Sequence, residues 1–149
     1  MAKKKVKPIP KGYSSVQASL NLPDAKSAME FVKKVFGGKI MGVMPGPDGK
    51  IMHGEVRVGE SVIMFSDAVM DPPRPGNLMV YVPNVDKTFG KAVKAGAKAL
   101  MPPSDQFWGD RFGRFEDPFG NRWGVGTHIE DVTPKQMKKR MAEMAKKKG

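Results

Sequence analysis

The order of apolar and polar residues along the chain switches between two periods, one typical of strands and one typical of helices. Residues 16–22 (VQASLNL) alternate residue by residue and predict a strand. In the stretch that follows, the apolar residues recur at helical spacing: Ala28, Phe31, Val32 and Val35. Asp24 is a candidate N-cap for this helix, and Gly37 a candidate stop, so the first pattern predicts a strand and then a helix.

The same succession of patterns recurs in the second half of the chain. Residues 78–82 (LMVYV) predict a strand. Asp86 lies near the start of a second helix, Gly96 near its end, and its buried stripe is expected to be Phe89, Ala92 and Val93. Pro23 and Pro83 match at an offset of 60 residues, as do Lys34 with Lys94 and Met41 with Met101. An internal repeat of this kind indicates two copies of one structural unit.

Each predicted helix is followed by three alternating segments that are separated by turn signals such as PGPDGK, GE and PFGN. Each half therefore predicts a βαβββ module. The expected domains are a basic tail (1–11), the first module (12–67), a Pro-rich linker (68–76), the second module (77–132), and a basic C-terminal helix and tail (133–149).

Charge and composition narrow the functional classes. The net charge of +11 lies in the tails: the first eleven residues hold five Lys and no acid, and the last seventeen hold seven basic residues and one Glu. Residues 12–132, between the tails, carry no net charge, so we expect no nucleic-acid partner beyond weak contacts of the tails. No apolar run reaches membrane-spanning length, and there is no cysteine, which excludes disulfides and predicts a cytoplasmic protein without a membrane partner.

Residues 105–123 (DQFWGDRFGRFEDPFGNRW) form the most unusual stretch. Gly109 and Gly113 are expected to allow sharp turns, and Asp117 to close an Asx turn in DPFGN. Strand alternation places Phe112, Arg114 and Glu116 on one face. Phe107 and Trp108, beside Asp110 and Arg114, suit a planar or anionic ligand; the alternative is a hydrophobic plug. Trp123 is expected in the core or in a pocket wall.

Two histidines are the remaining candidates for chemistry. His53 and Glu55 are two residues apart in a predicted strand, so they share a face with Arg57. This face is either exposed to solvent or turned into a polar cavity, where His53 and Glu55 would act as acid/base or hydrogen-bonding groups. His128 is expected to be a surface turn residue just after the last strand.

The two modules, with the phrases LPDAKSAMEFVKKVFGGKI, PDGKIMHGEVRVGESVIMFSD, DQFWGDRFGRFEDPFGNRW and THIEDV in this order, resemble the vicinal oxygen chelate superfamily. It includes glyoxalases, bleomycin-resistance proteins and extradiol dioxygenases, and the PhnB-like branch is the most similar. The resemblance implies an α+β fold in which two tandem βαβββ modules form a cupped eight-stranded mixed sheet, with a C-terminal helix. It also implies a small-molecule ligand in the cup and a homodimer.

In metal-dependent members of that superfamily, side chains of the first and last strands of each module hold a divalent ion. The corresponding positions here are Gln17, Met64, Asn77 and Gly124, and only Gln17 is an acceptable ligand. We therefore predict no metal and no cofactor. The alternatives left open are an unusual metal site at Gln17, His53 and Glu55, and an enzyme of the lyase, isomerase or dioxygenase type.

The function predicted from the sequence is metal-free binding of an unidentified small molecule. The residues expected to bind it are Gln17, His53, Glu55, Phe107, Trp108, Asp110, Arg114 and Trp123, with His53 and Glu55 also the candidates for catalysis. We further expect Trp108 and Arg114 to contribute more to ligand binding than to stability.

Overall fold

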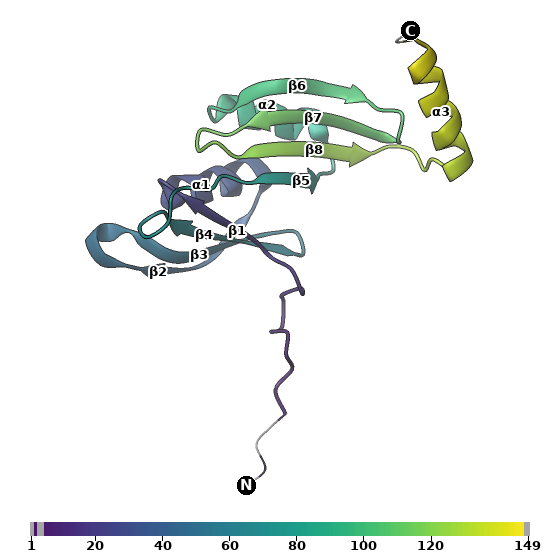
Figure 1. Ribbon diagram of the computed structural model, residues 1–149. Helices are drawn as coiled ribbons and strands as arrows, with labels where there is room; N and C mark the ends of the chain where they lie inside the picture. The colour runs from purple at the N-terminus through teal and green to yellow at the C-terminus, as the bar shows by residue number, and fades with distance from the viewer. Residues whose placement is uncertain (1, 3–4, 148–149) are drawn as a thin grey trace. The chain divides into compact units, whose positions relative to one another are not determined.

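The computed structural model describes residues 2 and 5–147, and the chain divides into two units between Pro75 and Gly76. Each unit contains its own four-stranded mixed sheet and a helix between its first and second strands (Figure 1). The prediction of an α+β protein with two βαβββ modules and a C-terminal helix is confirmed.

The first unit has the strand order β1-β4-β3-β2, in which β1 runs parallel to β4 and the other pairs are antiparallel. Its elements are β1 (Ala18–Leu22), α1 (Ala25–Phe36), β2 (Lys39–Pro45), the 3₁₀ turn η1 (Pro47–Gly49), β3 (Ile51–Val58) and β4 (Ser61–Asp67). The second unit repeats this topology with the order β5-β8-β7-β6. Its elements are β5 (Asn77–Tyr81), α2 (Val85–Lys94), β6 (Lys98–Asp105), β7 (Asp110–Glu116), β8 (Arg122–His128) and α3 (Pro134–Lys147).

Helix α1 begins and ends where the local sequence signals place it. The Asp24 side chain accepts a hydrogen bond from the Ser27 amide at 3.1 Å, and Gly37 adopts the left-handed conformation (φ 67°) that ends many helices. Its apolar stripe is buried against β3 and β4. Gly54 of β3 allows this approach, because a Cβ at this position would lie 2.6 Å from Met29 Sδ.

Helix α2 starts near Asp86, as the sequence predicts, and differs from the expectation in one residue of its buried face. Its N-cap is Asn84, which accepts a hydrogen bond from the Lys87 amide, and Asp86 lies in the first turn. The predicted burial of Val93 is wrong, since Val93 is 44% exposed whereas Val85 is 1% exposed. The buried face recurs at i, i+4 and i+7 from Val85, so Val93 falls at the margin of this face.

The hairpin of β7 and β8 is organised by Asp117. Its carboxylate accepts hydrogen bonds from the Phe119 and Asn121 amides, from Asn121 Nδ2 and from Trp123 Nε1, at 2.8–2.9 Å, and this confirms the predicted turn. Gly113 was predicted to form a turn, and this is wrong. It lies inside β7, where a Cβ would approach Phe89 and the backbone of β6 to 3.1–3.2 Å, so the residue permits close packing.

The C-terminal helix α3 begins with a reciprocal capping box. Thr133 Oγ1 accepts a hydrogen bond from the Gln136 amide, and Gln136 Oε1 accepts one from the Thr133 amide. Arg140 ties this helix to the second unit through the Phe107 carbonyl and the Glu130 carboxylate. Within the described part of the chain, no helix is both long and apolar enough to cross a membrane.

Candidate functional site

Helix α2 covers one face of the second sheet, and no other helix in the described part of this unit packs extensively on the sheet. Phe115, Trp123 and Val125 point to the α2 side and are 0–1% exposed. Strand register places the alternate residues on the other side, which we call the open face of the second sheet. It comprises Asn77, Met79, Tyr81, Asp110, Phe112, Arg114, Glu116, Arg122, Gly124, Gly126 and His128.

A shallow cavity of about 360 Å³ lies in the second unit, mainly on this open face. Its lining residues are Asn77, Leu78, Met79, Phe112, Arg114 and Gly124. Gly124 is needed for the close packing at its base, because a Cβ there would lie 2.9 Å from the Phe112 ring and 3.2 Å from Met79 Sδ. The lining therefore combines an apolar wall with two polar side chains, an amide and a guanidinium.

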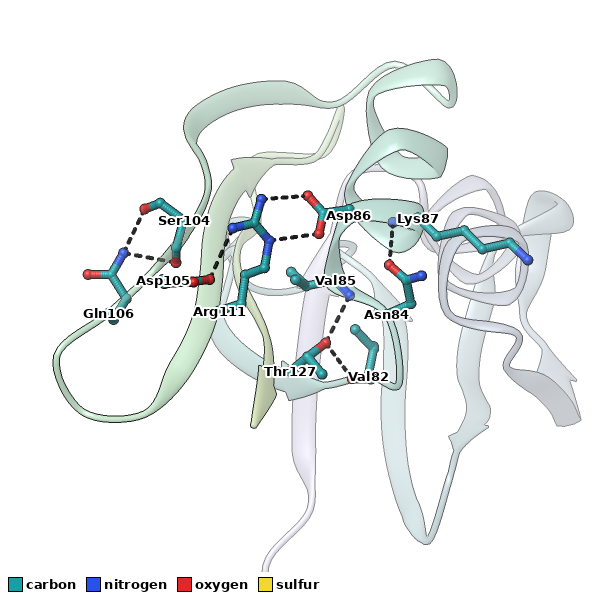
Figure 2. Close-up of polar contacts among 10 residues, drawn as sticks. All are labelled: Val82, Asn84, Val85, Asp86, Lys87, Ser104, Asp105, Gln106, Arg111 and Thr127. Atoms are coloured by element: carbon teal, nitrogen blue, oxygen red, sulfur yellow. Dashed lines mark hydrogen bonds and ion pairs between the residues drawn. The ribbon is translucent and has the colours of Figure 1, made fainter. Parts of the chain in front are cut away.

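Arg114 and its neighbour Arg111 have opposite environments. Arg111 points to the α2 side and binds Asp86 at 2.7 and 3.0 Å and Asp105 at 3.0 Å (Figure 2). These hydrogen bonds raise the pKa of Arg111 above its usual value and lower that of Asp86. Arg114 is half-buried, and within residues 2 and 5–147 its guanidinium has no hydrogen-bond or ion-pair partner. Arg114 thus contributes an uncompensated positive charge to the cavity.

At the far end of β7, Asp110 is buried and accepts three side-chain hydrogen bonds. The donors are Tyr81 Oη at 2.8 Å, Trp108 Nε1 at 2.9 Å and His128 Nδ1 at 2.8 Å. Burial alone would raise the pKa of Asp110, but the hydrogen bonds from these three groups together lower it. A buried aspartate with this set of donors stays ionised and fixes the side chains around it.

His128 is exposed, as predicted, but it is the last residue of β8 and lies opposite Asp110, so its placement in a turn after the strand is wrong. Its Nε2 lies 2.7 Å from Asp131 Oδ1, and the hydrogen bonds to Asp131 and Asp110 raise the pKa of His128. Counting back from the DPFGN turn would have paired Asp110 with His128, because an antiparallel hairpin pairs residues symmetrically about its turn.

Phe107 and Trp108 do not line the cavity. They lie beside it, next to Phe112, which does. Trp108 contacts Phe112 edge to face at a centroid distance of 5.7 Å, and Phe107 contacts Trp108 in the same way at 5.1 Å. The Trp108 indole is oriented by its hydrogen bond to Asp110. Trp108 and Asp110 therefore support the ring of Phe112, which does line the cavity.

Trp123 does not belong to this site. It is 1% exposed, points to the α2 side and donates its indole N–H to Asp117. Of the two places expected for Trp123, core and pocket wall, the structure places it in the core. Successive residues of β8 face opposite sides of the sheet. Because Gly124 faces the open side, its neighbour Trp123 faces away from it.

In the first unit, His53 and Glu55 lie on the sheet face opposite α1. His53 Nε2 is 3.6 Å from Glu55 Oε1, so the predicted pairing on one face is present. No local sequence pattern pointed to Tyr13, whose hydroxyl donates to both Glu55 oxygens at 3.0 and 2.9 Å. That hydrogen bond raises the pKa of Tyr13. Arg57 bonds the Gly12 carbonyl, so the segment before β1 crosses this polar face.

Gln17 is not joined to this group. Its amide oxygen accepts from the Ser14 amide and its Nε2 donates to the Ser14 carbonyl, both at 2.8 Å. The four positions that correspond to the metal ligands of related proteins offer a thioether, a glycine and two carboxamides, a donor set that does not fit a divalent ion. Among the described residues, no group of three His, Cys, Asp or Glu is arranged to hold a metal.

A larger cavity of about 570 Å³ lies in the first unit, between η1 and the segment after β4. Lys50 is the one basic residue of its lining, whereas Asp48, Asp67 and Asp71 are acidic, so the lining carries a net negative charge. The two oxygens of Asp67 already accept hydrogen bonds from the Ala25 and Ile51 amides. This cavity therefore disfavours an anionic ligand, in contrast to the smaller one, where the charged side chain is Arg114.

Comparison with known proteins agrees with this architecture. The sequence profile of the Glyoxalase/Bleomycin resistance protein/Dioxygenase superfamily matches residues 14–125, and the chain belongs to this superfamily. The uncharacterized protein Mb0911c of Mycobacterium bovis is 34% identical over 135 residues, which cover 83% of this chain and 89% of that protein.

Solved structures show the same fold. TioX from Micromonospora sp. ML1 has a TM-score of 0.66 at 24% identity and covers 78% of this chain and 99% of its own. Protein PA1353 from Pseudomonas aeruginosa has a TM-score of 0.66 at 25% identity, with coverage of 78% and 100%. A PhnB protein from Bacillus cereus has a TM-score of 0.60 at 19% identity, with coverage of 76% and 99%. The resemblance inferred from the sequence is confirmed.

Proposed function

We propose that this protein binds a small molecule without a metal, in the cavity on the open face of the second sheet. The observation that carries the proposal is the lining itself. Asn77 and Gly124, two of the positions where metal-dependent relatives would hold an ion, border the cavity together with Arg114. The lining contains no carboxylate or imidazole, and the positive charge there comes from a guanidinium.

The physical character of the lining supports reversible binding. Ligand pockets are mostly apolar with a few polar groups that orient the ligand, and their volumes are typically about 300–1,000 Å³. The cavity fits the lower end of this range. No group that lines it is suited to act as a nucleophile or general base, since the lining offers no carboxylate, imidazole, hydroxyl or thiol.

The test combines metal analysis with ligand detection on the full chain. Protein purified without chelator should contain far less than one equivalent of zinc, nickel or iron after dialysis. A fragment screen followed by ¹H–¹⁵N correlation NMR should shift the amide signals of residues 112–114 and 124 on binding. Stoichiometric metal that survives dialysis, or fragments that shift only signals elsewhere, would overturn the proposal.

A second candidate function is an acid/base enzyme centred on His53, Glu55 and Tyr13. The observation that favours it is their hydrogen-bonded arrangement on one polar sheet face. Tyr13 and Glu55 already satisfy each other, however, and His53 is 45% exposed, as expected for a surface cluster. Turnover of a lyase, isomerase or dioxygenase substrate that is lost in His53→Gln and in Glu55→Gln would favour the enzyme.

We also propose a cytoplasmic homodimer. Strand β2 is an edge of the first sheet and exposes Met41, Val43 and Met44 by 46–58%, and unpaired edges of this kind are usually covered. Sedimentation of the full chain at micromolar concentration should give the mass of two copies, and a single copy would contradict the proposal.

A further inference from the structure

We infer that the ligand of the second unit is a small organic carboxylate with an apolar body, held by Arg114. This inference rests on the proposed function and assigns the chemical class of its ligand. Three features of the cavity support it: the charges around it, the geometry of the Arg114 guanidinium and the apolar composition of its wall.

The charges on the open face leave Arg114 as the group that selects the ligand. Two acidic residues share β7 and this face with it. Asp110 is buried and already accepts hydrogen bonds from Tyr81, Trp108 and His128. Glu116 does not line the cavity, and within residues 2 and 5–147 it forms no ion pair with Arg114. A cationic ligand would therefore meet a positive charge with no carboxylate beside it, whereas an anion would be attracted.

The geometry of the guanidinium favours a carboxylate among anions. A guanidinium offers a planar fork of N–H donors that matches the two oxygens of a carboxylate, and such charge-assisted pairs are stronger than neutral hydrogen bonds. The side-chain amide of Asn77, which also lines the cavity, can donate a further hydrogen bond. A phosphate dianion has three oxygens to satisfy and is usually met by several cations or by a helix N-terminus. Arg114 is the single cation among the residues that line the cavity.

The wall around Arg114 determines the rest of the ligand. Met79 and Phe112 form the apolar side on the open face, and Gly124 lets them pack close together, because a Cβ there would lie 2.9 Å from the Phe112 ring and 3.2 Å from Met79 Sδ. The thioether of Met79 adapts to ligands of different shape, and the ring of Phe112 provides an aromatic surface. An aliphatic or aryl chain next to the carboxylate would be removed from water by these residues, which adds favourable binding energy.

The experiment compares two compounds with the same apolar body and different end groups, the anionic carboxylate of 4-phenylbutyrate and the neutral amide of 4-phenylbutyramide. Dissociation constants are measured on the full chain by ¹H–¹⁵N NMR titration, followed at the amide signals of residues 112–114 and 124. The carboxylate should bind about tenfold or more tightly than the amide, the range for a charge-assisted hydrogen bond. The preference should fall as salt is raised.

Three variants assign the effect to one side chain. Arg114→Gln should reduce the preference for the carboxylate to less than about threefold, and Arg114→Lys should retain part of it, since charge is kept but the fork is lost. Arg122→Gln is the matched control, because Arg122 lies on the same open face outside the lining and carries the same charge. It should leave the preference unchanged. Circular dichroism spectra of all variants check that they are folded.

The outcomes separate the inference from the proposed function. Equal affinity for the two compounds at the 112–114 and 124 signals would overturn the inference and leave the proposed function standing. The inference is equally overturned if the preference persists in Arg114→Gln or disappears in Arg122→Gln. If neither these compounds nor any neutral fragment of the screen shifts these signals, the proposed function fails and the inference with it.

Discussion

The hydrogen bond between Trp108 and Asp110 gives a prediction that a denaturant titration can decide. The indole N–H of Trp108 donates to a carboxylate that is itself buried, and the ring contacts Phe107 and Phe112 edge to face. Trp108→Phe removes the donor and keeps an aromatic ring. Trp108→Ala removes both the donor and the ring contacts.

The expected magnitudes follow from these contacts. A hydrogen bond to a charged group contributes about 1.5–3 kcal/mol, but Asp110 keeps two other donors, so Trp108→Phe should lower the unfolding free energy by about 1–2 kcal/mol. Edge-to-face aromatic contacts contribute about 0.5–1.5 kcal/mol each. Trp108→Ala should therefore lower the unfolding free energy by about 2–4 kcal/mol, and this replaces the expectation from the sequence that Trp108 contributes more to ligand binding than to stability.

The assay uses the fluorescence of Trp123, the other tryptophan in the chain, which is buried in the same unit and reports its unfolding in urea. Tyr81→Phe is the matched control, because it removes another donor to Asp110 from a side chain that is 62% exposed and that water can replace. It should cost less than about 1 kcal/mol. A loss below about 1 kcal/mol for Trp108→Ala, with Trp108→Phe equal to the parent protein, would refute the reasoning.

Three further predictions concern the same unit. Asp117→Ala removes four hydrogen bonds, two of them from the buried side chains of Asn121 and Trp123, and should lower the unfolding free energy by about 3–5 kcal/mol in the same urea assay; a loss below about 1.5 kcal/mol would contradict this. Gly109→Ala should cost more than about 2 kcal/mol in thermal or urea unfolding, because φ is 99° and a Cβ would collide with the Glu130 carbonyl; a neutral result would show that this segment rearranges. The pKa of His128 is raised above 6.5 by its hydrogen bonds to Asp131 and Asp110, so its contribution to stability is present below about pH 6.5 and lost as pH rises through the folded-state pKa. Urea midpoints between pH 6 and 9 should therefore decline in the parent protein and decline less in His128→Gln, and parallel curves would oppose this role.

Local sequence signals predicted the architecture because each depends on neighbouring residues only. Asp24 and Gly37 bound α1 through backbone hydrogen bonds and a left-handed φ, and Asp117 closes its turn within five residues. The repeat then implied that the second half folds like the first. These features are independent of how the sheets pack, which explains why the two βαβββ modules were predicted correctly.

The environment of the candidate site residues could not be predicted in the same way, because it depends on how elements that are distant in sequence pack together. Alternation showed that Arg111 and Arg114 face opposite sides, but only the position of α2 decided which of them is paired with acids and which is free. The same holds for the tryptophans: the register of β8 turned Trp123 into the core, whereas Trp108 lies in the turn before β7 and donates to Asp110. A side chain's environment is set by what the neighbouring elements place against it, and this information is contained in the tertiary structure and not in the local pattern.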